Sequence, residues 1–184
     1  MVAKAKKDWL FEAIGIIAEL GVNSLTIEAL TSRLGVTKGS FYHHFKNYQE
    51  FKEAFMTFFE EEGTLQIIKL AETAPTPAGK IALVLEATLQ GPPQVEVAIR
   101  AWALQDELVQ TYQERIDQQR IAYFQELFYA SNRTQAQALT MARLFYAIYV
   151  GSEHIRPPIT GEALRELYNE IRRLYSMPER KKTE

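Results

Sequence analysis

The stretch "SLTIEALTSRLGVTKGSFYHHFKNYQEF", residues 24–51, carries the start and stop signals of three helices in quick succession. Thr26 stands before "IEALTSRL" as a helix N-cap, and Gly35 stands where that helix would end. Thr37 is placed to cap a second helix of about seven residues, and Asn47 to cap a longer one. Two helices joined by a tight turn that contains glycine predict a helix-turn-helix.

The second helix of such a motif can enter a DNA major groove only if one of its faces is exposed. With about 100° between successive residues, Phe41 and Phe45 share one side and point to a core, while Gly39 and His43 lie nearly opposite. Tyr42 occupies one flank. The predicted exposed face therefore consists of Lys38, Gly39, Ser40, Tyr42 and His43.

These residue types suit DNA binding. Lysine reaches guanine acceptors or phosphates, serine both donates and accepts hydrogen bonds, and tyrosine donates to phosphate oxygens. A glycine within a helix costs about 1 kcal/mol relative to alanine. Gly39 therefore indicates a close approach of backbone to DNA, with a tolerated first-turn glycine as the alternative.

The adjacent His43 and His44 raise the alternative of a metal site. Neighbouring helical residues diverge by about 100°, so the pair cannot chelate one ion from one face. The third histidine, His154, is far along the chain. No metal is expected. His43 is predicted to face DNA rather than to stand idle in solvent, and His44 to pack at the core edge, with a phosphate contact as its alternative.

Composition excludes several classes of protein. The 184 residues contain no cysteine, which excludes disulfides, thiolate metal sites and a cysteine nucleophile and permits a cytoplasmic location. No apolar run approaches the roughly 20 residues that span a bilayer, so no membrane is expected. A net charge of −2 argues against indiscriminate coating of nucleic acid, although residues 1–47 hold six basic side chains against four acidic ones.

Nearly all remaining segments show apolar residues at helical spacing, which predicts an all-α fold of about nine helices. A first helix ends at Gly21, and the break "ETAPTPAGK", residues 72–80, interrupts the pattern. Further helices are expected at 78–90, 95–105, 106–130, 134–153 and 161–176. The predicted domains are a helix-turn-helix domain at 1–50, a helical body at 51–178 and a tail at 179–184.

The quoted stretch closely resembles the DNA-binding signature of TetR-family (tetracycline-repressor-like) transcription regulators, in which the recognition helix ends in an aromatic, histidine, phenylalanine, lysine run. The resemblance implies DNA contacts from Thr26, Thr37, Lys38, Gly39, Ser40, Tyr42, His43 and His44, and a backbone contact from Lys46. The sequence departs from the pattern in two respects. Tyr48 and Gln49 replace a frequent charged pair, and His43 replaces a more usual aromatic.

For the body, the resemblance implies a domain that binds a small molecule and forms a homodimer. Candidate ligand-binding residues are Arg100, Trp102, Gln105, Tyr123, Phe124, Tyr146 and Tyr149, with His154 as a further polar candidate. The alternative is that the aromatics only fill a core. Two apolar stripes would form the dimer interface unless both are buried within one chain: Leu139, Leu144, Ala147 and Val150, and Leu164, Leu167, Ile171 and Leu174.

These features predict a repressor that binds a palindromic operator in double-stranded DNA as a homodimer and is released by an unknown small molecule. No cofactor is expected. An all-helical enzyme using His43 or His44 is a rival, but no nucleophile, base and orienting group converge in the sequence. A helical adaptor that binds protein through its N-terminal unit is a second rival.

Overall fold

The computed structural model describes residues 4–90 and 93–176, which form helices joined by turns and contain no strand. The N-terminal unit consists of α1 (Lys6–Leu20), a 3-10 turn (Val22–Ser24), α2 (Ile27–Leu34) and α3 (Lys38–His44). The body consists of α4 (Tyr48–Glu60), a π-helical turn (Glu61–Leu65), α5 (Gln66–Ala71), α6 (Pro77–Gln90), α7 (Pro93–Ala103), α8 (Glu107–Ala130), α9 (Gln135–His154) and α10 (Gly161–Ser176).

The α4 helix, the π-helical turn and α5 follow one another without a break and make one rod. Counted so, the described helices number nine, and the all-α prediction is confirmed. Each of the five helices predicted after residue 72 begins and ends within two residues of its expected bounds. The predicted tail at 179–184 lies outside the described residues.

Side-chain caps explain several of the helix starts. Thr26 Oγ1 accepts from the Ala29 amide at 3.0 Å, Asn47 Oδ1 from the Glu50 amide at 2.8 Å, and Asp106 Oδ1 from the Val109 amide at 3.2 Å. Thr37 occupies the N-cap position of α3, but its side chain makes no capping hydrogen bond, which differs from the prediction. Gly35 ends α2 with a left-handed φ of 66°, a conformation that costs glycine little.

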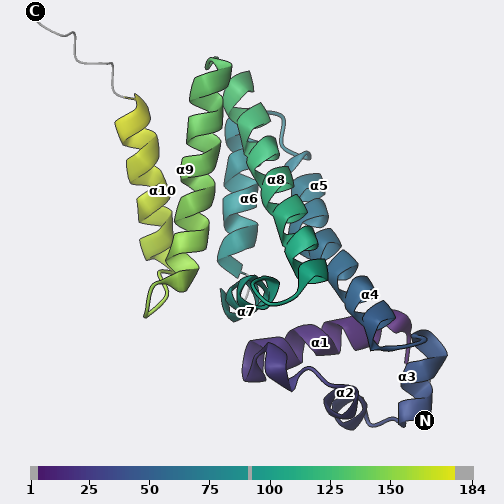
Figure 1. Cartoon of the computed structure of the whole chain (residues 1–184). Coiled ribbons are helices and arrows are strands. Elements are labelled where there is room, and N and C mark those ends of the chain that lie inside the picture. The colour runs from purple at the N-terminus through teal and green to yellow at the C-terminus, as the bar shows by residue number, and fades with distance from the viewer. Residues whose placement is uncertain (1–3, 91–92, 177–184) are drawn as a thin grey trace, which may run out of the picture.

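The molecule is elongated, with α1, α2 and α3 at one end and α9 and α10 side by side along the far edge of the body (Figure 1). The rod runs from the N-terminal unit into the body (Figure 1). None of the described helices is long and apolar enough to cross a membrane.

One hydrophobic core joins the N-terminal unit to the body. Trp9, Phe41 and Phe51 pack in the same buried cluster as Ile99 of α7 and Ile116 of α8. The division of the chain at residue 50 stays a prediction, and packing is continuous across it. Movement of the N-terminal unit therefore disturbs body helices as well as α4.

A second core lies farther along the body and unites α6, α8, α9 and α10. Phe128 packs against Phe145 with ring centroids 4.9 Å apart, and Tyr168 of α10 lies 5.2 Å from Phe145. Leu164 is buried in this cluster. The two cores flank the space in which the body's cavity lies.

Candidate nucleic-acid interface and internal cavity

Aromatic side chains hold α3 in place from behind. Phe41 and Phe45 are fully buried, as predicted, and the ring centroid of Phe41 lies 5.5 Å from that of Trp9 and 5.6 Å from that of Phe51. Edge-to-face and tilted pairs of this kind add to the stabilisation from buried area. The short helix is thus fixed by α1 and α4 rather than by its own few hydrogen bonds.

The opposite side of α3 faces solvent. Lys38, Gly39, Tyr42 and His43 are exposed, and Ser40 is half-buried. His44 is half-buried too, with its ring centroid 6.1 Å from that of Trp9. The two histidines therefore differ in environment, with His43 on the solvent face and His44 at the edge of the core.

None of the described residues packs so closely that position 39 must be a glycine. A Cβ atom added to Gly39 would meet only Thr37 Oγ1, at an ordinary contact distance of 3.5 Å. Its helical backbone needs no glycine either. The missing side chain at position 39 therefore matters for a molecule that approaches the exposed face of α3, and not for packing within the protein.

Two charged or polar residues, one at the start of α3 and one at the start of α4, already have partners. The Lys38 ammonium pairs with Glu28, and this hydrogen bond and charge raise the pKa of the lysine. Tyr48 Oη donates to the Leu25 carbonyl oxygen at 2.7 Å, and its ring is half-buried. Tyr48 thus braces the first turn of α4, which gives this departure from the family pattern a structural role. Lys46 is exposed.

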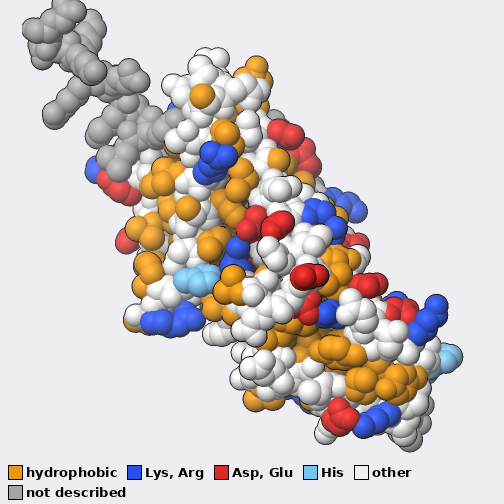
Figure 2. Space-filling view, viewed as in Figure 1, with side chains coloured by type: hydrophobic (Ala, Val, Ile, Leu, Met, Phe, Trp, Pro, Cys, Tyr) orange, Lys and Arg blue, Asp and Glu red, His pale blue; other side chains and the backbone are white. Residues whose placement is uncertain are grey.

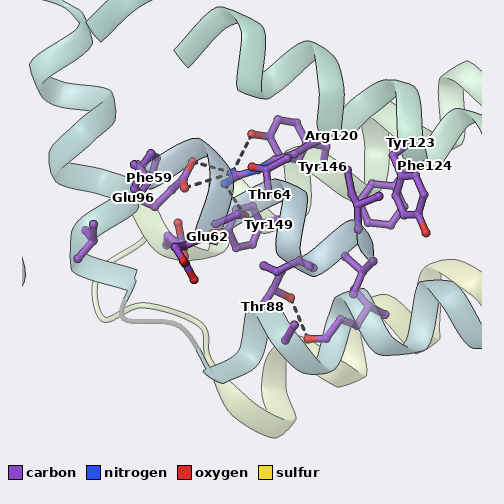
Figure 3. Close-up of a pocket in the computed structure, with 18 of the residues that line it drawn as sticks. Phe59, Glu62, Thr64, Thr88, Glu96, Arg120, Tyr123, Phe124, Tyr146 and Tyr149 are labelled. Carbon is purple, nitrogen blue, oxygen red and sulfur yellow. Dashed lines mark hydrogen bonds and ion pairs between the residues drawn. The ribbon is translucent and has the colours of Figure 1, made fainter. Parts of the chain in front are cut away.

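The body encloses a cavity of about 460 Å³. Most of its wall is apolar, with Phe59, Ile67, Leu85 and Phe124 among the lining residues. Figure 3 shows the labelled side chains converging on it from the π-helical turn and from α4, α6, α7, α8 and α9. This volume falls in the range of small-molecule sites.

Arg120 is the central polar residue of the cavity wall (Figure 3). Its Nη1 lies 3.1 and 3.2 Å from the two carboxylate oxygens of Glu96, and its Nε donates to Thr64 Oγ1 at 2.9 Å. Nη2 donates to the Gly63 carbonyl oxygen at 3.1 Å. Burial alone would lower the pKa of Arg120, but Glu96, Tyr146 and Tyr149 together outweigh this effect, raise the pKa and keep the guanidinium protonated.

Arg100 does not line the cavity but contacts Glu96, the carboxylate that pairs with Arg120. Its Nη2 lies 2.8 Å from Glu96 Oε1 and 2.8 Å from Asp117 Oδ1, and it donates to Tyr146 Oη at 2.6 Å. Tyr146 in turn donates to Asp117 Oδ1 at 2.7 Å. Two arginines thus face two carboxylates, and the network balances its own charge.

Glu153 of α9 lies close enough to that network to be affected by the charges of Glu96, Arg120 and Arg100. It lines the cavity, is only 7% exposed, and its Oε2 has no hydrogen-bond partner among the described residues. Burial, reinforced by the nearby negative charge of Glu96, raises the pKa of Glu153 to about 7. The cavity therefore presents a carboxyl group that lies between its neutral and charged forms near neutral pH.

Residues 10–55 match the family model described as "Bacterial regulatory proteins, tetR family". The match runs from α1 into α4, so the N-terminal unit of this chain is similar to that of TetR-family proteins. Its fold is similar to that of a TetR transcriptional regulator from Legionella pneumophila, with a TM-score of 0.79 and 11% identity over 95% of this chain and 98% of that one. No curated protein matches the chain by sequence.

Two further solved structures share this fold. The reduced form of NemR from E. coli has a TM-score of 0.79 at 16% identity, covering 94% of this chain and 98% of NemR. A TetR-family transcriptional regulator from Rhodococcus sp. has a TM-score of 0.72 at 18% identity, covering 93% of this chain and 98% of its own. The body of the TetR fold is thus present over nearly its full length.

Four of the seven predicted ligand-binding residues line the cavity: Tyr123, Phe124, Tyr146 and Tyr149. Arg100 lies behind the wall and contacts Tyr146. Trp102 and Gln105 line a separate hollow beside Tyr48 and Lys52. His154 is exposed, with its Nδ1 2.8 Å from the Val150 carbonyl oxygen.

Four charged residues that line the cavity were not predicted to do so: Glu62, Glu96, Arg120 and Glu153. The signal that could have found them is a charged residue on the apolar side of a helix, because charges are rarely buried without a reason. Across residues 4–90 and 93–176, no three histidine, aspartate or glutamate side chains are placed together to hold a metal ion.

Proposed function

We propose that this TetR-family protein is a ligand-responsive repressor, which binds a palindromic operator as a homodimer and releases it when a small molecule fills the cavity. A regulator of this kind acts in the cytoplasm and needs no catalytic residues. The observation that carries the proposal is the rod of α4, the π-helical turn and α5. It runs from the recognition helix to the cavity wall as one helical element (Figure 1).

The exposed face of α3 supports the DNA-binding half of the proposal. Tyr42 and His43 project from a helix whose other side is locked in an aromatic core. A rigid recognition helix suits base recognition, because its side chains and backbone lose little conformational freedom when DNA binds. Lys38 would exchange Glu28 for a phosphate or a guanine, and the unneeded glycine at position 39 would admit the DNA backbone closely.

The outer face of α9 and α10 supports a homodimer. Leu144 on α9 is 38% exposed and Leu167 on α10 is 40% exposed, and Ala147 lies exposed one turn from Leu144. Figure 2 shows hydrophobic side chains scattered along this edge of the body. A second copy would cover the face in an isologous four-helix interface.

The predicted stripe on α10 needs one correction. Leu164 is buried in the chain's own core because it packs with the second cluster, so it cannot contribute to an interface. The side chain of Leu174 lies outside the described residues. A two-fold dimer would set its recognition helices in successive major grooves, about 34 Å apart or a multiple of that.

The switch would act through the π-helical turn. This segment interrupts the α-helical register of the rod, and both Gly63 and Thr64 within it are hydrogen-bonded to Arg120 at the cavity. Such π turns are frequent at functional sites. A ligand that moves Arg120 would shift the rod and with it α3, provided that it binds one conformation better than the other.

The test is a gel shift with DNA that flanks the protein's own gene, performed over a series of salt concentrations. A regulator gives a discrete complex that competitor DNA of unrelated sequence does not remove, and whose affinity falls steeply with salt. An adaptor or an enzyme gives no such complex. That result would refute the proposal.

A further inference from the structure

We propose that the cavity selects a largely apolar molecule carrying a protonated amine, and that Glu153 is the residue that pairs with the amine. The inference rests on the proposed function only in taking the cavity as the effector site. It adds the chemical class of the effector and the side chain that selects it.

The volume and the lining of the cavity determine the size of the ligand and favour a largely apolar one. About 460 Å³ accommodates a molecule of drug-like size, and aromatic and aliphatic side chains supply most of the lining. Transfer of apolar surface from water into such a wall is favourable in proportion to the area buried. A small, fully polar effector would leave this wall unused.

The charges around the cavity determine whether the polar group of the ligand should be positive or negative. Arg120 and Arg100 are matched by Glu96 and Asp117 through direct contacts. Two further carboxyls line the same cavity, of which Glu62 pairs with Lys7 at 2.8 Å and Glu153 has no salt bridge among the described residues. When Glu153 is ionised, it adds a negative charge to the cavity, which favours a cation over an anion.

Glu153 also has the unfilled hydrogen-bonding capacity that a ligand would satisfy. A buried carboxyl oxygen without a partner costs free energy, so such atoms are uncommon in native proteins. Glu153 Oε2 is one of them among the described residues, and it belongs to a residue of the cavity wall. An ammonium group offers three donors and a compensating charge.

Arg120 is poorly placed to serve an anionic ligand instead. Its Nε donates to Thr64, its Nη1 contacts Glu96 and Tyr146, and its Nη2 donates to Gly63. A carboxylate ligand would have to displace Glu96, which is itself buried. That exchange would leave a buried charge without its partner.

The experiment uses three probes that share one apolar frame: biphenyl-4-ylmethylamine, biphenyl-4-ylmethanol and biphenyl-4-carboxylate. Their affinities for the full chain are measured at pH 8 by isothermal titration calorimetry. The amine should bind at least about tenfold more tightly than the alcohol, and the carboxylate should bind most weakly. Equal binding of amine and alcohol, a preference for the carboxylate, or no binding by any probe would overturn the inference.

Variants then assign the selecting residue. Glu153→Gln should abolish the preference for the amine while the alcohol binds as before. Glu61→Gln removes the same charge from an exposed site outside the cavity and should leave the preference intact. A preference that survives Glu153→Gln, or that is lost instead in Glu62→Gln at another lining carboxylate, would show that Glu153 is not the partner.

A change of pH provides a second measurement on the unaltered protein. Lowering the pH from 8 to 5.5 protonates Glu153 but not the alcohol probe, so the advantage of the amine should fall at least about fivefold. Of the other groups near it, the arginines and tyrosines keep their protonation states over this range. Besides Glu153, the charged and titratable groups around the cavity are Glu62, Glu96, Arg100, Arg120, Tyr123, Tyr146, Tyr149 and Tyr168.

An advantage that does not change with pH would count against Glu153. The gel shift separates this inference from the proposed function. If the amine binds through Glu153 but leaves the DNA complex intact, the ligand class stands and release of DNA by a cavity ligand fails.

Discussion

Arg120 on α8 donates a hydrogen bond from Nη2 to the carbonyl oxygen of Gly63, over 3.1 Å, and so ties the cavity to the π-helical turn. The same guanidinium pairs with Glu96 of α7. One buried side chain therefore joins three segments, one of which continues into the N-terminal unit. Arg120 therefore links the cavity wall to the rod that leads to α3.

Replacing Arg120 by glutamine should destabilise the fold. The change leaves Glu96 buried with only Arg100 opposite it, and breaking a buried pair in this way costs about 3 kcal/mol. Urea denaturation measures the loss. Arg173→Gln, which breaks an exposed pair with Glu170, is the control and should change stability by less than about 0.5 kcal/mol. Equal stability of the Arg120 variant and the parent would contradict the proposed role of the pair.

Removing side chains from the exposed face of α3 should weaken DNA binding and leave folding unchanged. Tyr42→Ala and His43→Ala each lose contacts worth about fivefold to tenfold in operator affinity. Tyr129→Ala is a matched control, because Tyr129 is 52% exposed against 54% for Tyr42 and lies at the far end of α8. Gel shifts measure affinity, and circular dichroism checks the fold. Unaltered operator affinity in either variant would remove that residue from the interface.

Lys46→Ala should weaken binding to every DNA sequence alike. A lysine that contacts only phosphate adds no base discrimination, and its loss should reduce the slope of log affinity against log salt by about 1. The measurement compares operator and unrelated DNA across the same salt series. A loss confined to the operator would instead indicate that Lys46 reads a base.

A charge on the outer face of α10 should prevent dimer formation. Leu167→Arg places an unpaired cation in the proposed apolar interface, and sedimentation velocity should then show a monomer where the parent is a dimer. Leu104→Arg is the control, because this leucine is also exposed but lies at the end of α7. A dimer that tolerates Leu167→Arg would place the interface elsewhere.

Glu153 should make the folded state less stable as the pH rises. Its pKa is raised to about 7, from an ordinary value of 4.5, so the folded state binds more protons than the unfolded state between these values. Stability from this residue is therefore full below pH 4.5, declines up to pH 7 and stays low above it. Glu153→Gln should be more stable than the parent at pH 8, by at most about 3 kcal/mol, and similar at pH 4.5. Urea denaturation at both pH values measures the difference. A Glu153→Gln variant that is less stable than the parent at pH 8 would contradict the prediction.

The helix-turn-helix could be predicted in detail because its signals are local. Capping by Thr26 and Asn47, the left-handed Gly35 and the inward side of Phe41 all depend on residues within one or two turns. The missing cap at Thr37 is the exception within this stretch. There, burial of the aromatic side of α3 supplies the order that a cap would have given.

The polar half of the cavity could not be predicted in the same way. Arg120 meets Glu96 across 24 positions of the chain and Thr64 across 56, and helical periodicity does not report such pairings. Aromatic spacing identified Tyr146 and Tyr149 as candidates but also Trp102, which lies at another hollow. Helical periodicity predicts which side of a helix is buried, but it does not predict which other helix packs against that side.

Residue order along the chain was sufficient for the helices, for most of their ends and for the inward or outward side of most residues of α3, because hydrogen bonds and caps act over three or four positions. Packing in three dimensions was needed to separate buried Leu164 from exposed Leu167 and to collect charges from α7, α8 and α9 around one cavity. Burial depends on which faces of distant helices meet. That choice is made by the whole fold at once, through the area it removes from water and the charges it must pair.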